Sequence, residues 1–332
     1  MGKFLITGGC GFIGSTLARA LVGRGEGVRI LDDLSTGRLD RAPSEAEVIV
    51  GSVTDVALVE QAMDGVDGCF HLAAVASVPR CQEDWTGTSA VNLGGTVAVF
   101  SAARRASTPV VYASSAAVYG ANPEVPLREG TRVRPLSAYG ADKLACELHA
   151  RVATLTQGVP ATGLRFFNVY GAGQDPSSPY SGVISIFCDR LRAGSPLTVY
   201  GDGLQVRDFV HVDDVVAFLI AAMEHPATRP EVFNICRGVG TSILGLASTV
   251  ADVLGVTADI RHGPPRNGDI PASIGDPRSA ARRFGWVPRT GLHDGLAKML
   301  TEQKPRHHQG AGVRTFPKGN EGVSRSSASG AP

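Results

Sequence analysis

The 332-residue chain has little of what marks several classes of protein. Aromatic residues make up 6% of it, its charges nearly cancel at +1, and its six cysteines contain no C-x-x-C pair. The balanced charge gives no electrostatic reason to expect nucleic acid or an anionic membrane surface as a partner. The scattered cysteines argue against a disulfide framework and against a zinc site, so no metal is expected.

Long hydrophobic runs are also missing, and none reaches the length of a membrane span. No leader-like run precedes the apolar segment that starts at residue 3, and unpaired thiols suit a reducing compartment. We therefore expect no membrane partner and a cytoplasmic location. With 43% hydrophobic and 19% charged residues, the composition is that of an ordinary globular protein.

A glycine-rich segment near the start is the most informative feature that is present. Residues 7–14 read Thr-Gly-Gly-Cys-Gly-Phe-Ile-Gly, between an apolar run and an amphipathic stretch. In such a strand–turn–helix unit Gly8 permits the tight turn, Gly11 lets the backbone approach a pyrophosphate, and Gly14 lets the helix pack closely. Asp32 ends the next apolar run, 18 residues beyond Gly14, near the spacing at which an acid meets the adenosine ribose. The pattern predicts a dinucleotide site.

The acidic end of the second expected strand favours NAD over its 2′-phosphorylated form. Asp32 would repel a 2′-phosphate, and the neighbouring Asp33 would strengthen that repulsion. Arg38 could in principle offset the two acids, but it stands in a loop whose direction the sequence does not give. We expect NAD.

Strand-like and helix-like segments alternate through the first half of the chain. This alternation predicts an α/β fold with a doubly wound parallel sheet of the Rossmann type. The expected strands are 3–7, 28–32, 47–50, 68–72, 109–114 and 160–166. The expected helices lie near 12–23, 56–63, 87–106 and 138–157.

The pattern changes at residues 170–182, which are rich in Gly, Pro and Ser. We expect residues 1–170 to form the NAD-binding domain, with 208–236 returning to it. Residues 171–302, with shorter and less regular segments, are expected to form a smaller C-terminal α/β substrate domain. The Gly- and Ser-rich residues 303–332 read as a disordered tail.

Two further patterns point to acid–base chemistry. Tyr139 and Lys143 lie four residues apart in an expected helix, so their side chains share one face. A nearby ammonium favours the tyrosinate form, which can serve as a general base. Ser114 and Ser115 close an expected strand at the carboxyl edge, where ligands bind in such sheets. Each pattern alone is common, but together with the glycine turn they predict a catalytic site.

With these motifs the chain resembles the extended short-chain dehydrogenase/reductase family. Within that family it is most similar to the NAD-dependent nucleotide-sugar 4-epimerases, those of UDP-glucose and UDP-N-acetylglucosamine, over about residues 3–300. The motifs beyond the glycine turn are His71-Leu-Ala-Ala74, Asn92-Leu-Gly-Gly-Thr96, Ser114-Ser-Ala-Ala-Val-Tyr-Gly120, Tyr139-x-x-x-Lys143, Leu164-Arg-Phe-Phe-Asn-Val-Tyr-Gly171, Gly201-Asp-Gly203, Arg207-Asp-Phe-Val-His211 and Arg266-x-Gly-Asp269.

The resemblance implies a role for particular residues. Ser115 and Tyr139 would contact the sugar 4-hydroxyl, and Lys143 would hold the nicotinamide ribose and tune Tyr139. The implied cofactor contacts are Gly8, Gly11, Phe12, Ile13, Gly14, Asp32, Asp33, Ser35, Thr36, Gly37, Ser52, Val53, Leu72, Ala73, Ala74, Asn92, Tyr139, Lys143 and, against the nicotinamide, Phe166. The implied contacts with a UDP-sugar are Ser115, Asn168, Val183, Tyr200, Arg207, Arg266, Asp269 and Ser273.

The reaction implied by the resemblance is reversible C4 epimerisation of a UDP-hexose through a 4-keto sugar, with NAD regenerated. Similar dehydratases carry Asp-Glu directly after the catalytic hydroxyl, and decarboxylases carry a Glu, where this chain has Ala116 and Ala117. Three alternatives stay open at this point. They are epimerisation of UDP-glucuronate or a UDP-pentose, reduction of a keto-sugar, and a non-catalytic NAD-binding scaffold, which would be marked by a lost Ser, Tyr or Lys.

Two positions set this chain apart within the resemblance. Ser273 stands where the family places a gate beside the sugar 2-substituent, and a small residue there leaves room for an N-acetyl group. We therefore expect UDP-GlcNAc and UDP-GalNAc as well as UDP-glucose and UDP-galactose, although serine is also ordinary loop filler. Ser52 replaces the Asp that reads the adenine amino group, so adenine is held without that charge, or Asp55 takes its place.

A homodimer through the helices near 90–105 and 140–155 is also implied.

Overall fold

A computed structural model of the chain describes residues 2–174, 182–266 and 268–302, and the predicted tail at 303–332 lies outside them. Its largest element is a seven-stranded sheet in the order β10-β6-β5-β4-β1-β2-β3, with every neighbouring pair parallel. The strands are β1 (Lys3–Thr7), β2 (Gly27–Asp32), β3 (Glu47–Val50), β4 (Gly68–His71), β5 (Val110–Ser115), β6 (Ala161–Phe166) and β10 (Glu231–Ile235).

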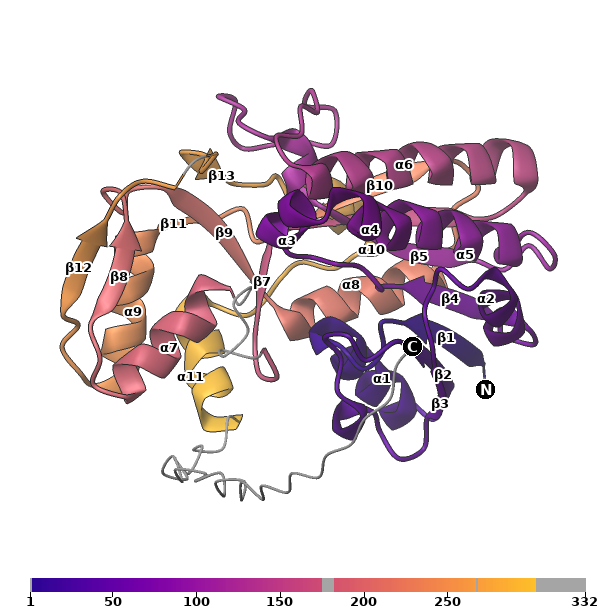
Figure 1. The fold of residues 1–332 in the computed structure, drawn as a ribbon, viewed down its shortest axis with the longest axis horizontal. Helices are drawn as coiled ribbons and strands as arrows, with labels where there is room; N and C mark the ends of the chain where they lie inside the picture. Colours follow the sequence, from indigo (N-terminus) through magenta and orange to yellow (C-terminus); the bar gives the residue numbers. More distant parts are fainter. Residues whose placement is uncertain (1, 175–181, 267, 303–332) are drawn as a thin grey trace, which may run out of the picture.

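Helices cover both faces of this sheet, because each strand alternates its apolar side chains between two cores. Ile6 and Val111 lie in the core that α1 and α8 share, whereas Leu5 and Val110 lie in the core under α2, α5 and α6. Figure 1 shows α5 and α6 on one side of the sheet and α1 and α8 on the other. These helices are α1 (Phe12–Gly23), α2 (Val56–Met63), α5 (Gly95–Ala103), α6 (Ala138–Gln157) and α8 (Val212–Glu224). The prediction of a doubly wound α/β fold is confirmed.

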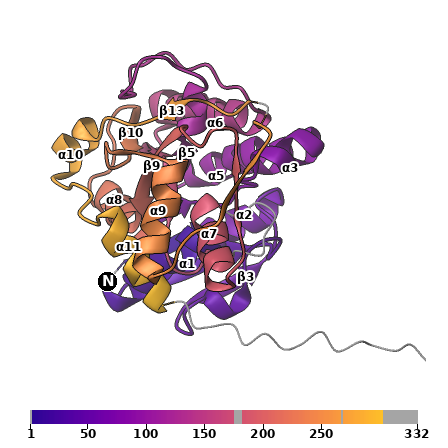
Figure 2. The ribbon, with the colours of Figure 1, turned by 90° about the vertical axis from the view of Figure 1, so that its left-hand side faces the viewer.

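A second group of elements follows the large sheet. Its strands form one sheet around β9, which pairs with β7, β11 and β13, and a second sheet of β8 with β12. Its three helices pack on a separate apolar core, and Figure 2 shows them at the front of the molecule. The elements are β7 (Asn168–Tyr170), α7 (Val183–Arg192), β8 (Leu197–Tyr200), β9 (Val206–His211), β11 (Gly240–Ser242), α9 (Ile243–Leu254), β12 (Ile260–Gly263), β13 (Ala272–Ser273) and α11 (Leu292–Glu302).

The stretch 208–236 divides between the two groups of elements. Helix α8 packs on α1, and β10 is the edge strand of the large sheet beside β6. Strand β9, in contrast, lies in the smaller sheet between β11 and β13. Helix α10 (Arg278–Phe284), late in the chain, packs back on β10 and α8. In the part of the chain that the structure describes, no helix has both the length and the apolar character to cross a bilayer.

One expected helix differs from the structure. The segment 87–106 spans the end of α4 (Trp85–Ser89), the π-helical turn η2 (Ala90–Gly94) and α5. Gly94 and Gly95 weaken the local preference for α-helix. The side-chain amide of Asn92, in the wide turn, exchanges two hydrogen bonds with the backbone of Val75. These bonds to a distant segment favour the wider turn, a form often found at functional sites.

Candidate active site

The glycine turn joins β1 to α1 and has no space for larger side chains. Gly8 has a φ of +70°, and a Cβ there would lie 2.8 Å from the backbone nitrogen of Ala73. A Cβ on Gly14 would lie 2.2 Å from the carbonyl oxygen of Gly8. Helix α1 begins after Gly11 with no side chain capping its first turn. The turn therefore leaves helix N–H groups available to an anion, as a pyrophosphate requires.

Asp32 lies at the end of β2 and is bonded to the glycine turn. Its carboxylate accepts hydrogen bonds from the backbone N–H groups of Cys10 and Leu34, each at 2.9 Å. A Cβ on Gly37 would lie 2.6 Å from Asp32 Oδ1, so the loop after β2 passes close to the carboxylate. Burial raises the pKa of Asp32, and the two backbone hydrogen bonds oppose that rise. This places an acid where the ribose end of a dinucleotide meets such a fold.

The neighbouring loop strengthens the preference for an unphosphorylated ribose. Asp33 is exposed, and its Oδ1 accepts hydrogen bonds from the backbone and the hydroxyl of Ser35. Arg38, the residue that could have offset these acids, pairs instead with Asp40. Thr36 is exposed beside them. The loop thus presents acidic groups near Asp32, in keeping with NAD.

The loop after β3 carries Ser52 and Asp55, the two residues considered for adenine. The hydroxyl of Ser52 lies 2.8 Å from that of Thr54, in the loop after β3. Asp55 caps α2, accepting a hydrogen bond from the backbone N–H of Leu58 at 3.1 Å. Asp55 therefore serves as the cap of α2, and the hydroxyls of Ser52 and Thr54 are bonded to each other in this loop.

The end of β4 is organised by two buried polar residues. His71 lies between the hydroxyls of Thr7, 2.7 Å from Nδ1, and Thr96, 2.9 Å from Nε2. Burial, with a smaller contribution from the charge of Lys143, lowers the pKa of His71 to about 3, so the ring is neutral near pH 7. Asn92, expected along the cofactor path, is fully buried and holds the loop after Leu72–Ala74 through Val75.

Helix α6 positions the tyrosine and the lysine. Ser137 caps the helix, because its hydroxyl accepts a hydrogen bond from the backbone N–H of Gly140 at 3.1 Å. Tyr139 lies in the first turn, and Lys143 lies one turn later, with its Nζ 5.9 Å from the centre of the tyrosine ring. Lys143 is only 2% exposed, and its Nζ donates a hydrogen bond to the carbonyl oxygen of Ala113 at 2.9 Å. The lysine therefore ties α6 to β5.

The structure distinguishes the two serines that end β5. Ser114 is buried, and its hydroxyl donates a hydrogen bond to Glu147 Oε1 at 2.5 Å. Ser115 is half-buried, and its Oγ accepts a hydrogen bond from the backbone N–H of Ala117 at 3.1 Å, at the start of η3 (Ala116–Tyr119). The Ser115 hydroxyl proton remains available to a substrate oxygen.

The register of the sheet brings these groups to one edge. Thr7 lies opposite His71, His71 lies opposite Tyr112, and Ser115 lies opposite Phe166. The glycine turn, the loop after β4 and the serine pair therefore follow the carboxyl ends of neighbouring strands. Phe166 itself is nearly buried in the apolar core at the end of β6.

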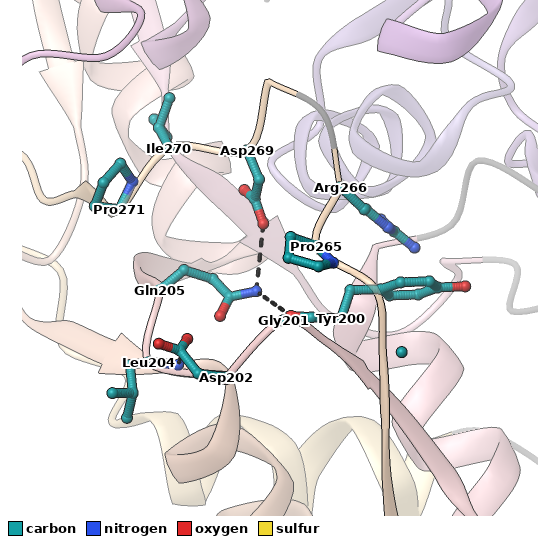
Figure 3. Close-up of a pocket in the computed structure, with 11 residues that line it drawn as sticks. Tyr200, Gly201, Asp202, Leu204, Gln205, Pro265, Arg266, Asp269, Ile270 and Pro271 are labelled. Atoms are coloured by element: carbon teal, nitrogen blue, oxygen red, sulfur yellow. Dashed lines mark hydrogen bonds between the residues drawn. The ribbon is translucent and has the colours of Figure 1, made fainter.

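A pocket of about 680 Å³ lies in the second group of elements (Figure 3). The guanidinium carbon of Arg266 lies 4.1 Å from the centre of the Tyr200 ring. Gln205, which was not predicted, donates hydrogen bonds from Nε2 to Asp269 Oδ2 at 3.3 Å and to the carbonyl oxygen of Tyr200 at 3.1 Å, as Figure 3 shows. The only sequence signal for Gln205 was its place between the Gly201–Gly203 and Arg207–His211 motifs.

The other predicted substrate residues lie outside the lining of this pocket. Arg207 pairs with Asp269, and burial lowers the pKa of its guanidinium while Asp269 opposes that shift. Ser273 is buried in β13, directly opposite Arg207 in the register with β9. Asn168 is exposed at the start of β7, and Val183 begins α7, half-buried against the third core.

Comparison with known proteins decides the family. The chain matches the NAD dependent epimerase/dehydratase family over residues 4–236. It belongs to this family. A UDP-glucose 4-epimerase of Mycolicibacterium smegmatis is 37% identical to it over 306 residues, 90% of this chain and 97% of that protein. The resemblance found in the sequence is thereby confirmed.

Two solved structures of such epimerases are similar over most of their length. The UDP-glucose 4-epimerase of Thermotoga maritima, solved with UDP-glucose, has a TM-score of 0.87 and 33% identity, covering 90% of this chain and 98% of that one. A UDP-N-acetylglucosamine 4-epimerase of Methanobrevibacter ruminantium, in complex with UDP-N-acetylmuramic acid, has a TM-score of 0.86 and 32% identity, covering 91% and 97%.

The cofactor of this epimerase/dehydratase family member is NAD, and its residues fit that cofactor. The cradle formed by Gly8 and Gly14 would be filled by a Cβ at either position, and it opens at the first turn of α1. Asp32 supplies the carboxylate beyond it. In the described part of the chain, no group of three or more His, Cys, Asp or Glu residues could hold a metal ion.

Proposed function

We propose that the protein catalyses the reversible C4 epimerisation of a UDP-hexose with NAD as its bound cofactor. The observation that carries this proposal is the arrangement of Ser115, Tyr139 and Lys143. The lysine is buried against β5, the tyrosine lies one turn before it on α6, and the serine ends β5 at the edge that also holds the glycine turn. The family and its 4-epimerase relatives support the same reaction.

The protein's own part in the reaction is to hold substrate and move one proton. When bound, NAD supplies the acceptor and then the donor of the C4 hydride. Tyr139, as tyrosinate, takes the proton of the sugar 4-hydroxyl at its Oη and returns it when the product forms. Lys143, which is buried, places its Nζ 5.9 Å from the centre of the Tyr139 ring. Ser115 orients the same hydroxyl by hydrogen bonding.

The residues after Ser115 argue for epimerisation against elimination of water. A dehydratase needs an acid and a base near the sugar in addition to the tyrosine. Ala116 and Ala117 follow Ser115 in η3, and neither can transfer a proton. The two alanines therefore leave proton transfer to Tyr139, with Ser115 orienting the hydroxyl.

The pocket of Figure 3 has the chemistry that a nucleoside diphosphate needs. Within it, Tyr200 offers an aromatic ring and Arg266 a cation for a diphosphate. Arg207 lies outside the lining and adds a second cation beside Asp269. Asp269 connects the two sides of this site, because it pairs with Arg207 and accepts from Gln205. We assign the UDP part of the substrate to these residues together with Asn168 and Val183.

Ser273 favours a substrate with a large 2-substituent. Ser273 is buried, and it lies opposite Arg207 in the register of β13 with β9. Its small side chain leaves more room for the sugar 2-substituent than an aromatic ring would. We therefore propose UDP-GlcNAc and UDP-GalNAc as substrates alongside UDP-glucose and UDP-galactose.

The test is incubation of the purified protein with UDP-glucose and, separately, UDP-GlcNAc, with the C4 epimers resolved by NMR. Wild-type protein should convert both. Ser273→Tyr should lose UDP-GlcNAc turnover by about 100-fold relative to UDP-glucose, because the ring fills the space of the N-acetyl group. Ser273→Ala is the matched control and should keep both. Conversion of neither sugar by the wild type, with NAD supplied, contradicts the proposed function.

A homodimer is the assembly that the surface supports. Leu148, Val152 and Leu155 of α6 are 59%, 53% and 58% exposed and recur at helical spacing. Val97 of α5, which packs beside α6, is also exposed. We infer that this apolar stripe, which water would otherwise face, pairs with the same stripe of a second copy.

Two further assignments concern the domain division and the cellular location. We infer that residues 1–170 apart from β7, together with α8, β10 and α10, form the NAD-binding domain, and that β7 and the rest of 171–302 form the substrate domain. The separate apolar core around α7, α9 and α11 supports this division. The six cysteines are all buried as free thiols, which supports a cytoplasmic location.

A further inference from the structure

A buried ion pair lies directly behind the catalytic edge of the sheet. It joins Arg165 of β6 to Glu147 of α6 in a two-pronged contact. Nε of Arg165 lies 2.8 Å from Oε1 of Glu147, and an Nη of Arg165 lies 2.7 Å from Oε2. Their side chains are 5% and 9% exposed, so both charges are enclosed by protein. The pairing of two planar groups in this way fixes their relative orientation as well as their distance.

The pair is bonded to the strand that ends in the catalytic serine. Ser114 donates a hydrogen bond from Oγ to Glu147 Oε1 at 2.5 Å. One turn earlier on the same face of α6, Lys143 donates from Nζ to the carbonyl oxygen of Ala113 at 2.9 Å. Helix α6 is therefore joined to β5 at the two residues that immediately precede Ser115.

The N–H groups on the other side of the Arg165 guanidinium also have hydrogen-bond partners. Arg165 Nη1 donates hydrogen bonds to the hydroxyl of Tyr119 at 2.7 Å and to the carbonyl oxygen of Glu129 at 3.1 Å. Tyr119 in turn donates to Asn234 Oδ1 at 2.7 Å. Burial lowers the pKa of Arg165, but the hydrogen bonds and charge of Glu147 outweigh it and raise the pKa overall. Arg165 therefore stays charged.

Stability alone gives little reason for such a pair. The cost of desolvating two charges offsets most of their attraction in a protein interior. The effect of the Glu147–Arg165 pair on the geometry of the site is larger than its effect on stability. Because neighbouring side chains of a strand point to opposite faces, holding Ser114 against α6 also fixes the direction of Ser115. Tyr139 lies two turns before Glu147 on the same helix, so the same contact fixes the tyrosine relative to the serine.

We propose that Glu147, Arg165 and Ser114 are positioning residues, which hold β5 against α6 so that Ser115 and Tyr139 meet one substrate hydroxyl. This inference rests on the proposed epimerase function. The three residues touch neither cofactor nor substrate in this scheme. Their contribution is to the placement of two groups, where a shift of about 1 Å can cost about 100-fold in rate.

The test compares Ser114→Ala with Tyr119→Phe, two single substitutions in the same network. Glu147→Ala is not used, because it would leave Arg165 buried and unpaired and is expected to fold poorly. Ser114→Ala removes one hydrogen bond to Glu147 and keeps the ion pair. Tyr119→Phe is the matched control, because it also removes a buried hydroxyl bonded to the pair, but one that bonds Arg165 and not Glu147 and that comes from η3 and not from β5. Each variant, loaded with NAD, is assayed with UDP-glucose for kcat and KM, and for NAD affinity and Tm.

Ser114→Ala should lower kcat by about tenfold or more, with KM and NAD affinity within about twofold of wild type. Tyr119→Phe should keep kcat within about twofold, while its Tm falls at least as far as that of Ser114→Ala, because Asn234 loses a donor. Wild-type kcat in Ser114→Ala, or an equal loss of kcat in Tyr119→Phe, would overturn the inference. An inactive wild type would instead overturn the proposed function, and this inference with it.

Discussion

The lysine of the site acts from inside the protein and not from its surface. Lys143 is buried, donates to the carbonyl oxygen of Ala113, and lies near Tyr139 on the same face of α6. A cation that water does not solvate acts more strongly on its neighbours. This one also acts on His71, whose pKa it helps burial to lower. The charge of Lys143 therefore adds to burial in keeping the nearby imidazole neutral.

Removing the tyrosine hydroxyl should remove most of the activity. In Tyr139→Phe the group that takes and returns the proton is gone, and kcat should fall by about 100-fold to 10,000-fold. The variant should still fold, because the ring stays in the first turn of α6. The measurement is kcat with UDP-glucose beside a thermal melt. Tyr170→Phe, which loses a hydroxyl bonded to Gly291 far along the chain, should keep kcat. A Tyr139→Phe enzyme with more than a tenth of the wild-type kcat would contradict this role.

His71 should make folding sensitive to mild acid. Burial lowers the pKa of His71 from its ordinary value of 6.5 to about 3 in the folded protein, so the unfolded chain binds the proton more readily. Its contribution to the free energy of unfolding is therefore fully present above about pH 6.5 and is lost as the pH falls towards about 3. His71→Asn lacks this titration, and its stability should fall less steeply between those values.

Urea unfolding of wild type and His71→Asn at several pH values measures the difference. Asp208, whose pKa burial raises to about 6, favours the folded state as the pH falls through that value. It is present in both proteins, so its effect cancels in the comparison. Parallel curves for the two proteins between pH 7 and pH 4 would refute the role assigned to His71.

Among the elements, the turn between β1 and α1 depends most strictly on its glycines. In Gly14→Ala the new Cβ would lie 2.2 Å from the carbonyl oxygen of Gly8, and the turn must open to admit it. We expect NAD affinity to fall by about tenfold or more, since the helix N–H groups move away from the pyrophosphate. Gly23→Ala, at the other end of the same helix, meets no atom within 4 Å and should bind NAD normally. Titration with NAD distinguishes the two, and equal affinities would count against the turn as the phosphate site.

The sequence was sufficient to predict the helices and strands that depend on a local residue pattern. The strands of the first half were predicted to within about a residue, because both faces of a parallel sheet are apolar and glycine or proline marks the ends. The break at η2 was missed, because it depends on Asn92 bonding Val75 across a loop. The Glu147–Arg165 pair was missed for the same reason, since only the pairing of β5 with β6 brings Ser114 and Arg165 together.

The residues of the candidate site also differ in whether the sequence could predict them. Residues in fixed-spacing motifs, such as Tyr139 with Lys143, could be read from the chain. The division of labour between Ser114 and Ser115 could be assigned only by resemblance, and the structure now gives it a physical basis in the contact of Ser114 with Glu147. Gln205 carried no chemical signal of its own, because its role comes from the fold placing Asp269 beside it.

At the scale of the whole molecule, the exposed stripe on α6 predicts a dimer. Leu148→Glu places a charge in the middle of that stripe, and burying an unpaired charge would oppose association. We expect the wild type to behave as a dimer and Leu148→Glu as a monomer in size-exclusion chromatography with light scattering. Leu39→Glu, at another exposed leucine, is the control and should stay dimeric. A monomeric wild type, or a dimeric Leu148→Glu protein, would exclude this interface.

The whole account depends on hydrogen leaving C4 of the sugar and returning to the same carbon within one closed site. The most direct measurement uses UDP-glucose deuterated at C4, incubated with the NAD-loaded protein in ordinary water and followed by NMR. The account predicts UDP-galactose that keeps the deuterium at C4, because the label passes to the bound cofactor and back. Product that has exchanged its label with solvent, or the absence of any UDP-galactose, would contradict it.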